Sequence, residues 1–432
     1  TGLSESGKST FITSLINQLL HHDNANMSGF SPVMGNRLLG VKLHPPADVL
    51  LASFPYEASY QMLAGSPPAW PPSTTGASGC IIELRLSKSG LLSEKLYSLF
   101  VEIRDYPGEW LLDLSLRNQS YLDWCRRTTS LYDQSLRQSL MGTLHSDLSQ
   151  LNPLAPVDHQ YLELLHRRFQ DFLKTCKKEG LSLIQPGRFL LPDVSTETGM
   201  LNFIPLTQCA NVSEDELINA GPDSYYMFCK SQYDEYVNTL VDPFYKQFFS
   251  KIDRQLVLVD VIRALNAGPE RFSDMQSAMT DITDSFAYGK QSRFFQLFQP
   301  KVDKVVFVAT KIDQVPATSH ENVRKLLASI IKSAYRSARH EGVDPVCEAA
   351  ASVRASQESE RGIVGYDKDG ERLGYDYPDI PAKIPEPHEW HTYQAWRIPE
   401  LSPPVGMVSN NDDAFPHIRM DAILNALVGD KC

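Results

Sequence analysis

The chain of 432 residues is longer than one ordinary domain, so we expect two domains, or one domain with a large insertion. Its net charge of -11 argues against nucleic acid as the default partner, because a protein that binds phosphate backbones needs a positive face. The seven cysteines form no C-x-x-C pair, which is typical of reduced thiols in a cytoplasmic protein. No apolar run approaches the roughly 20 residues that span a bilayer, although peripheral contact with a membrane stays open.

The chain begins in a glycine-rich loop, TGLSESGKST, which fits the pattern G-x-x-x-x-G-K-[ST] of loops that wrap nucleotide phosphates. Lys8 supplies a mobile positive charge for the β- and γ-phosphates, and Ser9 supplies a hydroxyl for Mg²⁺. Apolar residues at helical spacing follow from Phe11 to Leu20, so the loop opens a helix. Because such a loop normally follows a buried strand, we expect that strand to precede Thr1. The predicted phosphate-binding residues are Ser4, Glu5, Ser6, Gly7, Lys8, Ser9 and Thr10.

Residues 23–79 are predicted to be loop-like, because they are rich in Ser, Pro, Gly and Asn. A long polar connection at this point is where a nucleotide-sensing loop would lie. Thr75, with Thr74 as its neighbour, is the candidate for contact with Mg²⁺ and the γ-phosphate. The alternative is that a threonine in a proline-rich turn only caps the backbone.

Two strands are predicted next, an edge strand at 80–86 and a second strand at 97–103, with a turn region beginning at 87–90. The second strand ends in Asp105-Tyr106-Pro107-Gly108, a D-x-x-G pattern. Its carboxylate could hold Mg²⁺ through water, and the N–H of Gly108 could meet the γ-phosphate.

Residues 111–250 have a helical pattern and are too numerous for a connection within a compact nucleotide-binding fold, so we expect an inserted helical domain. Its aromatic stripe is interpreted as core. The flanking parts, 1–110 and 251–432, then form one discontinuous domain. Buried strands at 255–261, 304–309 and 345–351 alternate with helical patterns at 272–286 and 323–339. The predicted fold class is therefore α/β, with a doubly wound, mostly parallel sheet.

The C-terminal part has a different composition. Asp369-Gly370 predicts a hairpin, and the proline-rich stretch 378–404 predicts an extended segment whose aromatic residues pack on the surface. Binding of a partner is the alternative. A closing helix is expected at 421–428.

The motif Thr310-Lys311-Ile312-Asp313 follows a buried strand and indicates which base is bound. A carboxylate at Asp313 can accept hydrogen bonds from the N1–H and the 2-amino group of guanine, whereas adenine offers an acceptor at N1 and has no amine there. Lys311 would lie along the base. Thr310 replaces the more usual Asn of this motif. The segment Ser352-Val353-Arg354 matches the weaker S-A-K pattern, in which a backbone N–H meets the guanine oxygen.

These motifs resemble those of the Ras-like, translation-factor-related class of P-loop GTPases. More closely, the chain resembles the YcjX-like family of stress-associated bacterial P-loop proteins. The residues that carry the resemblance are 2–10, 70–75, 105–110, 309–313 and 351–354. The resemblance implies a cytosolic GTPase with a helical insertion that binds GTP or GDP with Mg²⁺. It does not identify the protein effector that such a switch would need.

The chain departs from the Ras-like pattern at Glu109, which occupies the position of the glutamine that orients water. A carboxylate there repels the γ-phosphate, so we expect slow hydrolysis, with Glu109 turned outward and Trp110 packed nearby. Arg85, Arg104 and Arg117 are candidates for an internal arginine finger, although surface charges are the simpler interpretation. Two alternatives stay open: an ATP-using P-loop enzyme, and a nucleotide-stabilised scaffold with negligible turnover. The predicted catalytic residues are Lys8, Thr75, Asp105, Gly108 and Glu109, and the predicted metal ligands are Ser9, Thr75 and Asp105.

Overall fold

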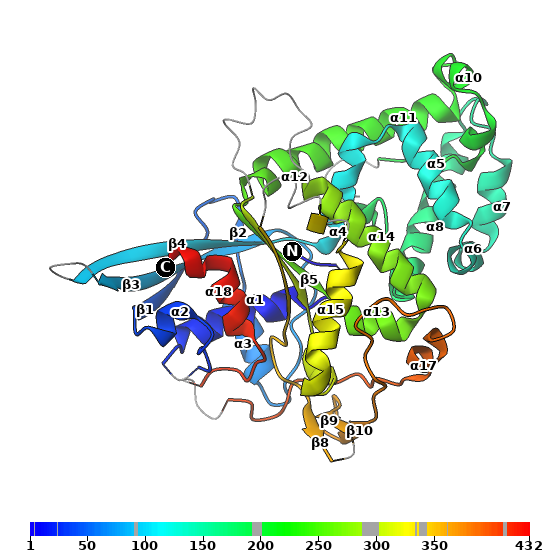
Figure 1. Cartoon of the computed structure of the whole chain (residues 1–432). Helices are drawn as coiled ribbons and strands as arrows, with labels where there is room; N and C mark the ends of the chain where they lie inside the picture. Colours follow the sequence, from blue (N-terminus) through cyan, green and yellow to red (C-terminus); the bar gives the residue numbers. More distant parts are fainter. Residues whose placement is uncertain are drawn as a thin grey trace. The chain divides into compact units, whose positions relative to one another are not determined.

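The computed structural model describes residues 1–3, 5–23, 25–89, 94–191, 201–286, 302–332, 335–336, 344–360, 362–408 and 413–432. The chain divides into two compact units (Figure 1). Unit 1 comprises Thr1–Gly108, Asp253–Phe272 and Lys301–Cys432, and unit 2 comprises Glu109–Ile252 and Ser273–Pro300. One boundary lies between Gly108 and Glu109, and Ser273–Pro300 groups with the helical unit, so helix α14 (Pro269–Phe286) spans the division. The inserted helical domain at 111–250 stays a prediction.

Unit 1 contains a parallel sheet in the order β5-β6-β7, formed by β5 (Arg254–Val259), β6 (Lys304–Ala309) and β7 (Asp344–Ala349). Strands β5 and β6 are mostly apolar and buried, as expected for a sheet that is covered on its faces, whereas β7 is partly buried. Thr1 and Gly2 run parallel to β5, and Leu258 N donates to Thr1 O at 3.0 Å. Helix α13 (Val261–Ala267) follows β5, and α15 (His320–Ile330) packs on β6 and β7. The mixed α/β class and the parallel strands are confirmed; the doubly wound arrangement stays a prediction.

The second sheet of unit 1 has β3 (Ser78–Ser89) at its centre. Strand β4 (Glu94–Asp105) pairs antiparallel along one side of β3, and β1 (Leu38–His44) and β2 (Ala52–Ser53) lie along the other. The predicted edge position of 80–86 is therefore wrong. The alternation that suggested an edge arises because one face of β3 is buried and the other faces outward.

Residues 23–79 are also more structured than predicted, because they contain α2 (Ser31–Met34), α3 (Tyr56–Ala64), β1 and β2. These elements are short, and prolines and glycines separate them, so composition concealed them. In the turn region predicted at 87–90, residues 87–89 belong to β3, and Gly90 lies outside the described residues.

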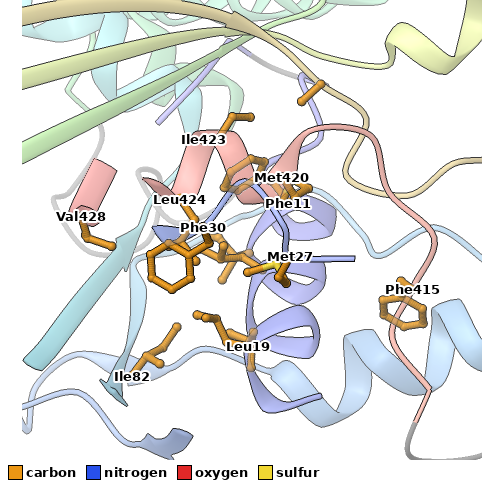
Figure 2. Packing of buried hydrophobic residues seen from close by; sticks show 14 of the residues in the cluster. Phe11, Leu19, Met27, Phe30, Ile82, Phe415, Met420, Ile423, Leu424 and Val428 are labelled. Atoms are coloured by element: carbon orange, nitrogen blue, oxygen red, sulfur yellow. The ribbon is translucent and has the colours of Figure 1, made fainter. Parts of the chain in front are cut away.

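Helix α1 (Lys8–Leu20) contributes five apolar side chains to a hydrophobic core of unit 1 (Figure 2). The predicted closing helix is confirmed as α18 (Met420–Val428), and its apolar side chains join this core with those of α1 and β3. Full burial of each large apolar side chain contributes about 1.5–3 kcal/mol. The residues labelled in Figure 2 are Phe11, Leu19, Met27, Phe30, Ile82, Phe415, Met420, Ile423, Leu424 and Val428.

The predicted C-terminal hairpin is confirmed. Strands β9 (Gly362–Tyr366) and β10 (Arg372–Tyr375) are antiparallel, and β8 (Gln357–Ser359) pairs with the other edge of β9. The proline-rich stretch is interrupted by α17 (Trp390–Ala395), which packs on α13. Trp390, Tyr393 and Trp396 are buried, as the packing interpretation predicts.

The described part of unit 2 is helical. It contains α4 (Gly108–Asp113, whose first residue belongs to unit 1), α5 (Tyr121–Tyr132), α6 (Ser135–Met141), α7 (Thr143–Gln150), α8 (His159–Lys178), α10 (Glu214–Ile218), α11 (Tyr225–Tyr236), α12 (Asp242–Gln247) and most of α14. The aromatic stripe interpreted as core is mostly buried. Its Tyr233 packs against Trp124 and Phe203, and the three ring centroids lie 5.5–5.6 Å apart. Offset and edge-to-face contacts of this kind stabilise a core beyond the apolar area that they bury.

Candidate functional site

The glycine-rich loop has the backbone of an anion-binding loop. Glu5 and Gly7 both lie in the left-handed region, with φ of 62° and 86°. Gly7 is the N-cap of α1, and no side chain caps this helix end among the described residues. The first N–H groups of α1 and the positive end of its dipole are therefore available to an anion. Ser4 lies outside the described residues.

Lys8 turns back over its own loop. Its Nζ donates to Gly2 O at 3.3 Å and to Leu3 O at 3.4 Å. Ser6 Oγ is buried and has no hydrogen-bond partner within the described part of the chain. A buried hydroxyl without a partner costs free energy, so this donor is available to a phosphate oxygen. Thr10 is half-buried in the first turns of α1.

The hydroxyls of Ser9 and Thr74 meet beside the carboxylate of Asp105. Thr74 Oγ1 donates to Asp105 Oδ2 at 2.7 Å, and Ser9 Oγ lies 3.2 Å from Thr74 Oγ1. Burial raises the pKa of Asp105, while the Thr74 hydroxyl and the charge of Lys8 act in the opposite direction. Such a set of hard oxygen donors fits Mg²⁺.

The structure brings Thr74 rather than Thr75 to this cluster. Thr75, the residue that we selected from the sequence, is exposed, whereas Thr74 is half-buried. The two are adjacent in an irregular loop, so the backbone path alone decides which side chain turns inward.

The Thr310–Asp313 motif lies against the phosphate loop. Lys311, at a φ of 59°, places its Nζ 3.2 Å from Glu5 O and 2.7 Å from Asp260 Oδ2. Asp260 caps α13 by accepting from Arg263 N at 3.0 Å, and the Arg263 guanidinium forms an ion pair with the Glu5 carboxylate. Sequence reasoning missed Asp260 and Arg263; the available signal was an aspartate directly after a buried strand.

Asp313 is buried among donors from the segment that follows β7. Its Oδ2 accepts from Ala355 N at 2.9 Å, from Ser356 N at 3.1 Å and from Ser356 Oγ at 3.2 Å. Burial raises the pKa of Asp313 to about 6, and these hydrogen bonds oppose the rise. Thr310 is also buried, with its Oγ1 3.4 Å from Val259 O.

The segment Ser352-Val353-Arg354 lies immediately before the donors to Asp313. Ser352 O accepts from Ser14 Oγ at 2.5 Å, which ties the segment to α1, and Val353 is buried in the core. Arg354 is exposed, and its backbone N–H donates to Pro416 O at 2.7 Å. The backbone donors Ala355 N and Ser356 N escaped sequence reasoning because backbone groups leave no side-chain signature.

Gly108 is buried at the start of α4, and Glu109 is the first residue of unit 2. The Glu109 carboxylate forms an ion pair with Lys177 at 2.7 Å, and Trp110 packs edge-on against Phe244. Each arginine considered as a finger contacts a polar neighbour: Arg85 bonds Ser98, Arg104 pairs with Glu102, and Arg117 pairs with Asp242.

A G-x-x-x-x-G-K-S loop that opens a helix beside parallel strands places the chain in the P-loop class of α/β proteins. The chain belongs to the YcjX-like family, DUF463, whose model matches residues 1–432. It is 38% identical over 448 residues to the "Ras-like GTPase YcjX" of Escherichia coli (strain K12), covering all of this chain and 94% of that protein. It is 35% identical over 457 residues to the protein of the same name from Shewanella oneidensis, covering all of this chain and 93% of that protein. Among the described helices, none has the length and apolar character needed to cross a membrane.

Proposed function

We propose that the chain binds GTP and GDP with Mg²⁺, hydrolyses GTP slowly and acts as a nucleotide-controlled switch. The observation that carries the proposal is the contact of Lys311 Nζ with Glu5 O at 3.2 Å, because it joins the base-recognition motif to the phosphate loop within one unit. The name of both relatives, "Ras-like GTPase YcjX", supports the same function.

In this proposal the phosphates lie in the loop at the start of α1. The N–H groups of the loop and of the first helical turn donate to the phosphate oxygens, and Lys8 exchanges its contacts with Gly2 O and Leu3 O for the β- and γ-phosphates. Ser9, Thr74 and Asp105 would hold the cation, which supplies charge neutralisation to the phosphates when bound. Gly108 would donate its N–H to the γ-phosphate.

The base would be selected by Asp313. The N–H groups of residues 355–356 hold this carboxylate in place through contacts to Oδ2. Guanine offers two donors to such a carboxylate, and adenine offers an acceptor in the place of one of them. Adenine would therefore give this carboxylate neither of the two donors that guanine offers and would set an acceptor against it, which argues against an ATP-using enzyme.

Slow turnover is proposed because Glu109 forms an ion pair with Lys177 in unit 2. A carboxylate held in this way does not orient water as a glutamine amide would. The same observation favours a second candidate, a nucleotide-stabilised scaffold with negligible hydrolysis.

Single-turnover GTP hydrolysis, with and without Mg²⁺, tests the proposal on the wild type, on Lys8→Ala and on Lys42→Ala, a control at an exposed lysine of β1. Loss of one charge-stabilising group lowers hydrolysis about 10²–10³-fold, so Lys8→Ala should lose the Mg²⁺-dependent rate and Lys42→Ala should keep it. A wild-type rate equal to that of Lys8→Ala, with GTP bound by the wild type, would contradict hydrolysis and favour the scaffold.

A further inference from the structure

Lys177 forms an ion pair with the buried carboxylate of Glu109. The Glu109 side chain is 7% exposed, and its Oε1 accepts from Lys177 Nζ at 2.7 Å. Lys177 lies in the last turn of α8 and is 31% exposed. A buried carboxylate needs such a partner, because an uncompensated charge in an apolar surrounding is strongly destabilising.

The rest of α4 is fixed to unit 2 as well. Asp113 accepts from Gly187 N at 2.7 Å, from Arg188 N at 3.2 Å and from Tyr236 Oη at 2.5 Å. The Arg188 guanidinium lies 4.0 Å from the centre of the Trp110 ring. These contacts do not involve Lys177, so replacing this lysine should leave α4 in place while removing the charge opposite Glu109.

The charge of Glu109 lies close to the proposed γ-phosphate contact. Gly108 and Glu109 are consecutive residues, so their Cα atoms are about 3.8 Å apart. Covalent geometry therefore keeps the Glu109 carboxylate at a separation from this N–H that is comparable with the Debye length of about 8 Å at physiological salt, so an uncompensated carboxylate would repel a γ-phosphate held by the N–H of Gly108. GDP lacks the γ-phosphate, so this repulsion would affect GDP binding much less.

We infer that Lys177 is a positioning residue for the proposed GTP site: it holds the Glu109 carboxylate within unit 2 and neutralises its charge, which allows the site to accept a γ-phosphate. The inference rests on the proposed function. It assigns to a residue of the helical unit, 68 positions after Glu109 in the chain, a role in distinguishing GTP from GDP.

The test measures the dissociation constants of a non-hydrolysable GTP analogue and of GDP, with Mg²⁺, by calorimetry on the full chain. Coupling between two sites typically changes affinity by about fivefold or more. Lys177→Ala should therefore lower the affinity for the GTP analogue at least about fivefold and leave the affinity for GDP within about twofold of the wild-type value. Lys177→Arg keeps the cation and should preserve both affinities. Lys174→Ala is the matched control, because Lys174 lies on the same helix and pairs with the exposed Asp171.

The double variant Glu109→Gln/Lys177→Ala removes the charge that Lys177 compensates, so it should restore affinity for the GTP analogue. Three results would overturn the inference while leaving the proposed function intact. Lys177→Ala could lower the affinities for GDP and for the GTP analogue equally, or it could lower neither. The double variant could also fail to restore affinity for the GTP analogue. If Lys177→Ala does not fold, Glu109→Gln alone decides: it should bind the GTP analogue at least as tightly as the wild type, and weaker binding would overturn the inference. A wild type that binds neither nucleotide would overturn the proposed function itself.

Discussion

The hydroxyl of Thr74 donates to the carboxylate of Asp105 at 2.7 Å, joining two residues that lie 31 positions apart in the chain. With Ser9 Oγ 3.2 Å from the same threonine oxygen, the start of α1, the loop before β3 and the end of β4 meet at one point. All three segments belong to unit 1, so the oxygen cluster does not depend on the placement of unit 2.

This relationship predicts different consequences for two neighbouring threonines. Thr74→Ala removes a hydroxyl from the oxygen cluster and should weaken Mg²⁺-dependent binding of a GTP analogue about tenfold, the loss expected for one charge-assisted hydrogen bond or metal ligand. Thr75→Ala should change it less than about twofold, because the Thr75 side chain is exposed. Titration with a fluorescent GTP analogue at several Mg²⁺ concentrations measures both. A larger loss for Thr75→Ala would show that Thr75 replaces Thr74 when the nucleotide binds.

The raised pKa of Asp313 predicts a pH dependence of binding. Guanine requires the ionised carboxylate, so GDP affinity should fall by up to about tenfold per pH unit below a pH of about 6. Stability should change in the opposite direction: because the folded pKa exceeds the unfolded value, this group adds stability as the pH falls from about 6 to about 4. Calorimetric titration with GDP between about pH 5 and 8, roughly the range where the Asp313 carboxyl titrates, measures the effect on GDP affinity.

The control for that prediction is Asp313→Asn, which should bind GDP more weakly than the wild type but without the additional fall in affinity below a pH of about 6. Titration of the nucleotide's own phosphates affects both proteins equally, so it cancels in the ratio of their affinities. Identical slopes in the two proteins would mean that Asp313 does not carry the pH dependence.

The buried ion pair of Arg137 and Asp274 predicts a large effect on stability in unit 2. The two side chains are 1% and 0% exposed, and Asp274 also accepts from Ser182 N and from Leu183 N. Asp274→Ala leaves a buried guanidinium without its partner and should cost about 3–5 kcal/mol. Chemical denaturation followed by tryptophan fluorescence measures the free energy of unfolding. Asp171→Ala, at an exposed pair, should cost less than about 1 kcal/mol, and equal costs would refute the distinction.

The close approach of the 187 loop to α4 makes a further prediction. A Cβ on Gly187 would overlap Glu109 O, a backbone atom that cannot rotate away. Gly187→Ala should therefore destabilise unit 2 by about 1–3 kcal/mol. Gly221→Ala is the control, because its nearest neighbour is the flexible carboxylate of Asp223 at 3.1 Å. Thermal unfolding measures both, and a stable Gly187→Ala would show that the loop can move away from α4.

The strongly periodic parts of the sequence predicted their structures well. The glycine-rich loop and α1, the apolar strands β5 and β6, and the closing helix α18 have patterns that a single local preference explains. The order of these elements also predicted that Lys311 lies beside the loop, because the carboxyl ends of parallel strands lie at one edge of the sheet.

The remaining features depend on tertiary structure and left weak signals. The central position of β3 follows from β1, whose alternation is interrupted by Gly40 and by a shift in register at 38–40. Likewise, the backbone donors of residues 355–356 to Asp313 carry no side-chain signature. The partner of Glu109 could not be inferred, because Lys177 is one of several charged residues on α8 and only the packing of unit 2 selects it.

The most direct test of the account is nucleotide selection by Asp313. Xanthine carries an oxygen where guanine carries its 2-amino group, so an asparagine amide at position 313 can donate where the aspartate accepts. We predict that the wild type binds GDP at least about 100-fold more tightly than ADP or xanthosine diphosphate, and that Asp313→Asn prefers xanthosine diphosphate over GDP. Equal or tighter binding of ADP by the wild type, or an unchanged base preference in Asp313→Asn, would contradict the assignment of this site to guanine.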